Sequence, residues 1–254
     1  MPLEALLFDV DGTLADTERD GHRVAFNQAF AEAGLDWEWS VDLYGELLSV
    51  TGGKERIRHY LDAYRPDVTL PANADEFIRG LHQAKTRFYT EGLAGGTIPL
   101  RPGVRRLLDE ARDQGLRLAI ATTTTPENVT ALLENTLGQD GPSWFEVIAA
   151  GDVVPAKKPA PDIYFYALEK MGLAPQRCLA FEDSGNGIRS SLGANLATLI
   201  TVNGYTRDHD FSGAALVLDQ LGEPDQPFAV LAGDSGGARY VDVGLLRRIH
   251  EAAA

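Results

Sequence analysis

Residues 5–18 read ALLFDVDGTLADTE, a short apolar run that ends in two carboxylates on either side of one valine. Residues two apart on a strand point the same way, so Asp9 and Asp11 would project together beyond the carboxyl end of a buried strand, where open α/β sheets bind ligands. Like charges this close need a counter-ion, and a hard divalent cation would supply it while polarising a phosphoryl oxygen. Taken alone, the motif could equally be a turn with two solvated acids.

Strand-like segments recur along the rest of the chain and alternate with segments of helical spacing. Gly115, Gly172 and Gly193 stand where such helices would stop. This alternation predicts an α/β fold with a mostly parallel sheet. The expected strands span residues 4–9, 116–122, 145–150, 177–182, 196–201 and 215–218.

One part of the chain breaks this alternation. Between about residues 16 and 95 no convincing strand occurs, and segments of helical pattern are separated by Gly and Pro signals. We therefore expect a helical domain at residues 16–95, inserted after the first strand of a core formed by residues 1–15 and 96–254. A terminal helix at 243–253 is expected to pack on the core or to contact another copy. The expected helices of the insert span residues 22–33, 41–48, 53–64 and 74–92.

Composition limits the partners. The 254-residue chain has a formal net charge of -14, which argues against nucleic acid because binding a polyanion requires a basic face. No stretch of about 18 apolar residues predicts a membrane span, and the first strand begins almost at Met1. We therefore expect a cytoplasmic protein, or one of the plastid stroma if a transit peptide was removed. The lone cysteine, Cys178, excludes an internal disulfide and is expected in the core.

Two further segments place polar side chains at the ends of expected strands. Thr122 and Thr123 lie in IATTTT, and hydroxyls and amides at a helix N-terminus can hold phosphate oxygens, although helix capping is the commoner role of such a threonine. Lys158 precedes a proline in AKKPAPDIY and could hold a phosphoryl group. The neighbouring Lys157 fits a solvated surface lysine better.

A fourth segment, LAFEDSGNGI, ends in Glu182 and Asp183, which are either metal ligands facing the first pair or chance acids in a loop. Each segment alone is weak, but all four in this order, each at the end of its own apolar run, are strong. With DVDGT, TT, KKP and EDS in the four motif places, the chain resembles the haloacid dehalogenase superfamily of phosphatases and phosphomutases. The resemblance implies a Rossmann-like core with a small α-helical cap.

The resemblance also implies a mechanism. Asp9 would be the nucleophile that forms an aspartyl phosphate, and Asp11 would protonate the leaving alkoxide and then activate water. Thr122 and Lys158 would hold the transferring phosphoryl group. Mg²⁺ would be held by the carboxylate of Asp9, the backbone carbonyl of Asp11 and Asp183, with Glu182 near or in the shell.

Within the superfamily, stretches such as DTERDGHRVAFN, VDLYGELLSVTGGKERI and AGDVVPAKKPAPDIY are similar to the CbbY proteins. These are cap-bearing phosphatases associated with the Calvin cycle that remove one phosphate from xylulose 1,5-bisphosphate, an inhibitor of Rubisco. The similarity implies a small phosphorylated sugar as the partner. Contacts to the sugar or its distal phosphate would come from Glu18, Tyr44, Gly52, Gly53 and Lys54.

Cations of the insert suit a second phosphate. Besides Lys54, the insert offers Lys85, which falls where the related β-phosphoglucomutase has a phosphate-binding lysine, whereas Arg56 and Arg87 are expected at solvated positions. His22 is the nearest equivalent of a histidine of that mutase, but its spacing is one residue longer, which argues against mutase chemistry.

We therefore expect a monomeric, Mg²⁺-dependent sugar bisphosphate phosphatase. Two alternatives remain open. One is a β-phosphoglucomutase-like sugar phosphomutase that uses the same aspartates. The other is a non-catalytic phosphate-binding protein, since a fold alone does not dictate activity.

Overall fold

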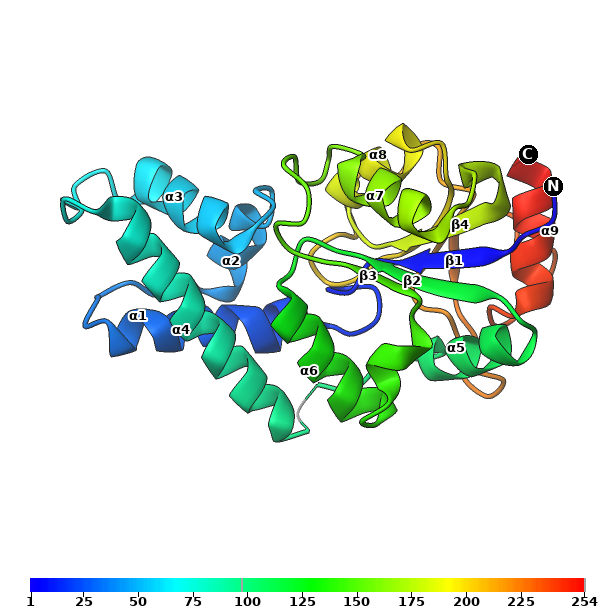
Figure 1. Cartoon of the computed structure of the whole chain (residues 1–254), viewed down its shortest axis with the longest axis horizontal. Coiled ribbons are helices and arrows are strands. Elements are labelled where there is room, and N and C mark those ends of the chain that lie inside the picture. Colours follow the sequence, from blue (N-terminus) through cyan, green and yellow to red (C-terminus); the bar gives the residue numbers. More distant parts are fainter. Residues whose placement is uncertain (97, 254) are drawn as a thin grey trace.

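The computed structural model describes residues 1–96 and 98–253 and consists of two parts (Figure 1). A sheet covered by helices lies at one end, and a group of helices formed by residues 18–94 lies at the other. The expected α/β fold, with a helical insert after the first strand, is confirmed.

The sheet has the strand order β3-β2-β1-β4-β5-β6-β7, and every neighbouring pair is parallel except β6 and β7. The chain leaves β1 toward β2 on one side and returns to β4 on the other, which makes the carboxyl ends of β1 and β4 the expected place for a ligand. The strands span Ala5–Phe8 (β1), Arg117–Ala121 (β2), Val147–Ala149 (β3), Cys178–Glu182 (β4), Ala197–Thr201 (β5), Leu216–Leu218 (β6) and Val230–Gly233 (β7).

Alternate side chains of β1 enter different layers of the core, as the two-residue period of a strand requires. Leu6 and Phe8 pack in a cluster with side chains of α5, α6 and α9, whereas Ala5 and Leu7 pack with side chains of α7. Burial on both faces explains why the strands read as continuous apolar runs. The helices span Val104–Asp113 (α5), Pro126–Leu137 (α6), Asp162–Met171 (α7), Gly185–Gly193 (α8) and Val243–Ala253 (α9), with short 3-10 helices at Gly141–Trp144 (η2) and Pro175–Arg177 (η3).

The helical group has a hydrophobic cluster of its own. Phe26, Phe30, Trp39 and Tyr44 are almost fully buried in it, and the rings of Phe30 and Trp39 meet edge to face with centroids 5.0 Å apart. The group therefore does not depend on the sheet for all of its apolar burial. It consists of a π-helix at Glu18–His22 (η1) and of α-helices at Arg23–Glu32 (α1), Val41–Leu47 (α2), Gly53–Tyr64 (α3) and Ala74–Ala94 (α4).

The two segments that join the helical group to the sheet lie side by side. Ala15 forms an isolated bridge with Leu100. The buried guanidinium of Arg101 pairs with Asp16 at 3.3 Å and donates to the carbonyl oxygen of Val202 at 2.6 Å. One arginine thus ties both joining segments to the loop after β5.

Two elements differ from the prediction. The antiparallel strand β7 extends the sheet where no strand was expected; Val230 and Leu231 are 43% and 50% exposed, so β7 lacks the buried face that produces a periodic pattern. The π-helix η1 precedes the expected helix start, and the N–H of Arg23 donates to the carbonyl oxygen of Glu18, five residues earlier.

Two further predictions, the packing of the terminal helix and the burial of the lone cysteine, are confirmed. Leu245 and Leu246 of α9 are buried against the core of the same chain, and Cys178 is buried. Within residues 1–96 and 98–253, no helix combines the length and the apolar character that a membrane crossing needs.

Candidate active site

Asp9 directly follows β1 and is buried, with only 7% of its surface exposed. Its backbone N–H donates to the carbonyl oxygen of Phe181 in β4, which fixes it beside the end of the neighbouring strand. Its Oδ1 accepts a hydrogen bond from Nζ of Lys158 at 2.7 Å. The first, third and fourth motifs of the sequence therefore meet at the crevice that the strand order predicts.

Lys158 joins its own motif to the other three. Besides Asp9, its ammonium donates to Oε1 of Glu182 at 2.6 Å and to the carbonyl oxygen of Ala121, the last residue of β2, at 2.8 Å. Burial would lower the pKa of Lys158, but Asp9 and Glu182 outweigh it and raise this pKa above its ordinary value. Lys158 is therefore a fixed positive charge.

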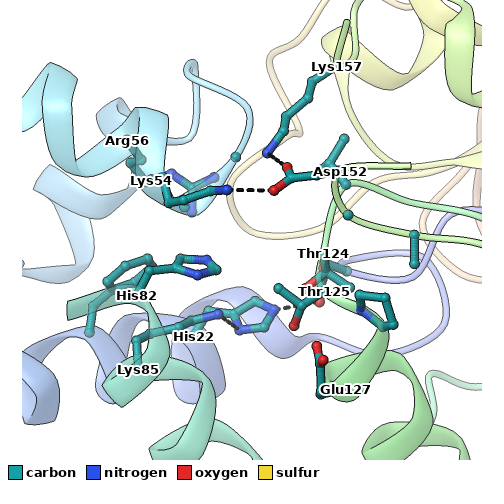
Figure 2. Close-up of a pocket in the computed structure, with 18 of the residues that line it drawn as sticks. His22, Lys54, Arg56, His82, Lys85, Thr124, Thr125, Glu127, Asp152 and Lys157 are labelled. Atoms are coloured by element: carbon teal, nitrogen blue, oxygen red, sulfur yellow. Dashed lines mark hydrogen bonds and ion pairs between the residues drawn. The ribbon is translucent and has the colours of Figure 1, made fainter. Parts of the chain in front are cut away.

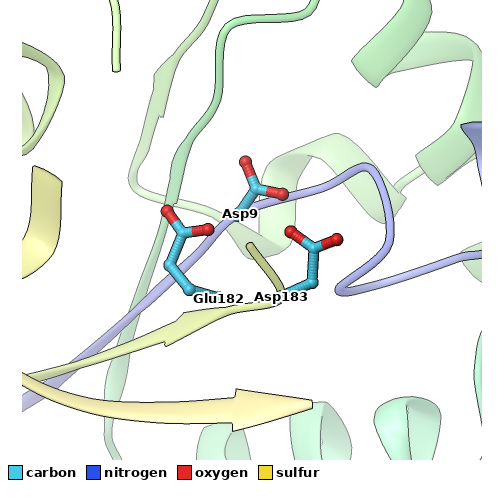
Figure 3. A group of neighbouring side chains, drawn as sticks. All are labelled: Asp9, Glu182 and Asp183. Atoms are coloured by element: carbon cyan, nitrogen blue, oxygen red, sulfur yellow. The ribbon is translucent and has the colours of Figure 1, made fainter. Parts of the chain in front are cut away.

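Asp9, Glu182 and Asp183 form a cluster in which one carboxylate oxygen from each lies within 4.8 Å of the others (Figure 3). Oε2 of Glu182 is buried and has no hydrogen-bond partner. Two glycines make room for the cluster. A Cβ on Gly12 would clash with Oδ2 of Asp183, and a Cβ on Gly187 would clash with Oε2 of Glu182.

The electrostatics of this cluster favour a cation. Burial raises the pKa of Asp9 to about 7; Lys158 opposes the shift, and Glu182 and Asp11 add to it. Burial, together with the charges of Asp9 and Glu182, also raises the pKa of Asp183 well above its usual range. Three converging carboxylates, one oxygen left without a partner and a single compensating lysine fit a divalent metal ion.

The carboxylate of Asp11 turns away from this cluster. Its Oδ1 accepts hydrogen bonds from Thr17 at 2.5 Å and lies 2.8 Å from Nε2 of His22, whose Nδ1 lies 2.8 Å from Nζ of Lys85. Burial would raise the pKa of Asp11, but the interaction with His22 and the hydrogen bond from Thr17 lower it to about 2. The π-helix η1 accommodates the additional residue before His22 and still brings its ring to Asp11.

The site occupies two adjoining cavities. A small one of about 80 Å³ is lined by the side chains at the strand ends, and a larger one of about 390 Å³ lies between the helical group and the loops after β2 and β3. Asp11, Glu18, Arg56 and Thr123 line both of them. The buried Thr122 lines the small cavity and accepts a hydrogen bond from the N–H of Thr124 at 3.3 Å.

The predicted residues of the insert gather around the larger cavity (Figure 2). Glu18, Gly52, Gly53, Lys54 and Lys85 all line it. Tyr44 does not line it, but its hydroxyl donates to Oε2 of Glu18 at 2.5 Å and so holds that carboxylate in place.

Two predictions about cations are wrong. Arg56 is buried, not solvated, because its guanidinium donates to the hydroxyl of Tyr44 at 2.9 Å and to the carbonyl oxygen of Leu47 at 3.2 Å. Lys157 is only 16% exposed, because its ammonium pairs with Asp152 at 3.0 Å and with Glu55 at 3.3 Å. By contrast, Arg87 is exposed as expected.

Several residues of the larger cavity escaped the sequence prediction, among them His82, Thr124, Thr125 and Asp152. His82 lies three residues before Lys85, so helical spacing alone would have placed both on one face. Burial, followed by the charge of Lys85, lowers the pKa of His82 to about 3. Thr124 and Thr125 continue the TTTT run ahead of α6, and their position at that helix N-terminus was the available signal.

Comparison with known proteins agrees with this geometry. The family model of haloacid dehalogenase-like hydrolases matches residues 3–195. The chain is 47% identical over 248 residues to the plasmid CbbY protein of Cupriavidus necator, covering 98% of this chain and 97% of that protein. Two crystal structures of CbbY from Rhodobacter sphaeroides are each 47% identical in sequence to this chain, one with phosphate and one of a mutant with xylulose-(1,5)-bisphosphate. Their TM-scores are 0.81 and 0.80, and each comparison covers 86% of this chain and 94% of the solved chain.

The chain therefore belongs to the haloacid dehalogenase-like hydrolase family, within which it is CbbY-like. It is an enzyme, a phosphatase of the phosphoric monoester hydrolase class.

Proposed function

We propose that the enzyme is a Mg²⁺-dependent phosphatase that removes one phosphate from a sugar bisphosphate, with xylulose 1,5-bisphosphate as the preferred substrate. One observation carries the proposal: each of the two adjoining cavities has at least one lysine that the other lacks. Lys158 lines the small cavity, and Lys54, Lys85 and Lys157 line the larger one. A substrate with a phosphate at each end matches this distribution of charge. The crystal structure of a CbbY protein with a pentulose bisphosphate supports it.

In this proposal Asp9 attacks phosphorus and forms an aspartyl phosphate, which divides one difficult displacement into two easier ones. Lys158 holds Oδ1 of Asp9 and stands beside the place where negative charge develops on the transferring group. Thr122 directly follows β2, the other neighbour of β1, and its hydroxyl is a further group that can hold the transferring phosphoryl group. These groups act by position and charge, as phosphoryl transfer requires.

Asp9, Asp183 and the backbone carbonyl of Asp11 would hold Mg²⁺, and Oε2 of Glu182 is the fourth available oxygen. When bound, the ion offsets the charge of the carboxylates and polarises the phosphoryl oxygens.

Asp11 serves as general acid for the leaving alkoxide and then as general base for water. Because its lowered pKa makes it a carboxylate in the free site, Asp11 must take up a proton before it can protonate the leaving group. Lys85, when protonated, can only donate, so Nδ1 of His22 must accept and the Nε2–H donates to Asp11. Lys85 therefore fixes the tautomer of His22, and His22 fixes the orientation of the Asp11 carboxylate.

We also propose that residues 16–95 form a cap domain over a core of residues 1–15 and 96–254. The separate hydrophobic cluster of the helical group and the paired joining segments at Ala15 and Leu100 support this division. Closure of such a cap excludes water from the reaction. A monomer in the reducing environment of the cytoplasm fits the single, unpaired cysteine.

The test is a comparison of kcat/KM for xylulose 1,5-bisphosphate with the values for xylulose 5-phosphate and other sugar monophosphates, each with and without Mg²⁺. We expect the bisphosphate to be preferred, and Asp9→Asn to abolish turnover of every substrate. Equal or better turnover of the monophosphates would remove the bisphosphate assignment. Activity that survives full removal of divalent metal would remove Mg²⁺.

A β-phosphoglucomutase-like activity is the second candidate, and one observation favours it. The spacing of His22 argued against mutase chemistry, yet the π-helix brings His22 to 2.8 Å from Asp11, where it can serve the same aspartate. Formation of glucose 6-phosphate from β-glucose 1-phosphate, at a rate comparable with bisphosphate hydrolysis, would establish it. Hydrolysis without isomerisation would leave the phosphatase alone.

A further inference from the structure

A crossed set of ion pairs joins α3 of the helical group to the loop after β3. Lys54 of α3 pairs with Asp152 of the loop at 2.5 Å, and Lys157 of the loop pairs with Glu55 of α3 at 3.3 Å. Lys157 also lies 3.0 Å from the second oxygen of Asp152. The carboxylate of Asp152 is thus held between two ammonium groups from opposite sides of the larger cavity (Figure 2).

The burial of these groups is unequal. The side chain of Lys157 is 16% exposed and that of Lys54 is 29% exposed, whereas Asp152 is 61% exposed. The lysines are therefore parts of the cavity wall, and the carboxylate is a group that can swing out into water. Hydrogen bonds from Lys54 and Lys157 lower the pKa of Asp152 to about 2, so it is charged at any working pH.

Gly52 makes this arrangement possible. A Cβ at position 52 would clash with Oε2 of Glu55 and lie 2.9 Å from Nζ of Lys157, and the residue has a φ of +99°, which L side chains rarely adopt. The absence of a side chain lets the ammonium of Lys157 approach the start of α3 closely.

The two neighbouring lysines of the KKP motif serve different cavities. Lys158 lines the small cavity beside Asp9, and Lys157 lines the larger one. A carboxylate that accepts from two ammonium groups with its two oxygens presents the same pattern of acceptors as two oxygens of a phosphate monoester. The position of Asp152 therefore marks a place where a phosphate would find two donors.

We propose that Lys157, together with Lys54, binds the phosphate that the enzyme leaves on its product, and that the carboxylate of Asp152 occupies this position until the substrate displaces it. The inference rests on the proposed bisphosphate phosphatase function and adds to it a residue that sets selectivity for a second phosphate. Asp152 is released to solvent when the substrate binds, and its negative charge opposes ligands that bring no phosphate to replace it.

The first experiment measures kcat/KM of Lys157→Met for xylulose 1,5-bisphosphate and for xylulose 5-phosphate. Loss of one charge-assisted hydrogen bond predicts a fall of about ten- to a hundredfold for the bisphosphate and little change for the monophosphate. Lys157→Arg keeps the charge and should retain most of the preference. Lys170→Met, which removes an exposed lysine of α7, should alter neither value.

Asp152→Asn gives the second readout. Removal of the competing charge should raise kcat/KM for the bisphosphate, by up to about fivefold given the modest strength of a partly exposed ion pair, and leave the monophosphate unchanged. If the ion pairs only hold the two parts of the enzyme together, both variants lose activity equally on both substrates, and the inference is wrong. It is also wrong if Asp152→Asn does not raise the bisphosphate value.

Failure of the two ideas is separable in the same data. A wild-type enzyme without a preference for the bisphosphate overturns the proposed function. A wild-type preference that survives intact in Lys157→Met overturns only the role of Lys157. Circular dichroism and thermal melting of every variant distinguish a change of selectivity from a loss of fold.

Discussion

At the scale of single residues, Lys85 is the group whose protonation can be tested most directly. It is buried, it contacts Nδ1 of His22, and it lies 5.2 Å from the ring centroids of Phe26 and Tyr89. Burial lowers its pKa to about 8, although Asp11 and Glu18 oppose the shift. Lys85 is therefore protonated at neutral pH but not far above it.

We expect kcat to decline as the pH rises through about 8, because a neutral Lys85 no longer forces His22 to donate toward Asp11. A profile of kcat against pH for the wild-type enzyme measures this decline as its alkaline limb. Lys85→Arg stays charged across the range and should lose the limb, although its overall rate is lower. A limb at the same pH in Lys85→Arg would assign it to another group.

The glycine behind Glu182 gives a second test at this scale. A Cβ on Gly187 would clash with Oε2 of Glu182, so Gly187→Ala should displace that carboxylate and weaken Mg²⁺ binding. Gly80 in α4 is the matched control, because nothing lies within 4 Å of its Cβ position. Gly80→Ala should stabilise the fold by about 0.5–1 kcal/mol and leave metal affinity unchanged. Titration of activity and melting temperature with Mg²⁺ checks both, and equal metal affinity in the two variants would contradict the role of Gly187.

The sequence predicted the residues of the small cavity better than the cations of the larger one. Asp9, Glu182 and Asp183 each end or directly follow an apolar strand, and parallel strands bring their carboxyl ends together. Lys158 lies in the loop between β3 and α7 and was predicted from its place before a proline. Burial of Arg56 and Lys157 depends instead on partners from other segments, Tyr44 for one and Asp152 for the other. No local sequence pattern predicts partners from distant segments.

At the scale of elements, the six strands of the parallel sheet lie within the predicted segments because burial on both faces makes each an uninterrupted apolar run. β7 is an edge strand paired on one side only, and its four residues are all exposed. Its pairing with β6 comes from tertiary structure that the local sequence does not encode. The local sequence likewise does not encode the π-helix η1, because its geometry depends on the contact between His22 and Asp11.

Deletion of Asp20 tests whether η1 holds one residue more than an α-helical turn needs. Asp20 is exposed, and the hydrogen bond from Arg23 to Glu18 spans five residues, so the shortened segment can close as an ordinary turn with His22 still beside Asp11. We expect this variant to fold and to keep most of its activity. Deletion of Gln28, an exposed residue of α1, is the control, since it rotates the following residues by about 100° and misplaces Phe30. Equal damage from both deletions would contradict this role of η1.

At the scale of the whole molecule, the larger cavity exists only because the helical group closes on the loops of the sheet. The sequence predicted the α/β part and the helical insert after its first strand, since the change from alternating to purely helical pattern is local information. It did not predict which side chains meet across the gap. Asn186 of α8 donates to the hydroxyl of Thr51 at 2.9 Å. The ring of Tyr205, in the loop after β5, packs against that of Tyr44 with centroids 6.2 Å apart. Such contacts depend on the relative placement of the parts.

Metal removal tests this architecture as a whole, because the acidic cluster joins β1 to β4 at the base of the cavities. The folded protein gathers three buried carboxylates, two of which pair with Lys158, and the unfolded chain does not, so Mg²⁺ should bind only the folded state. At a free concentration a hundredfold above its dissociation constant, such binding stabilises the fold by about 2.7 kcal/mol. For a chain of this size that corresponds to a rise in melting temperature of roughly 5–10 °C over a sample in EDTA.

Asp183→Asn separates this effect from nonspecific stabilisation by salt. The variant lacks one of the three carboxylates, so its melting temperature in EDTA should equal or exceed that of the wild type, because buried like charges repel less. Addition of Mg²⁺ should then raise it far less than it raises the wild type. The same rise in both proteins would place the ion elsewhere, and no rise in either would remove the metal from the buried cluster and with it the counter-charge that Asp9 and Asp183 require.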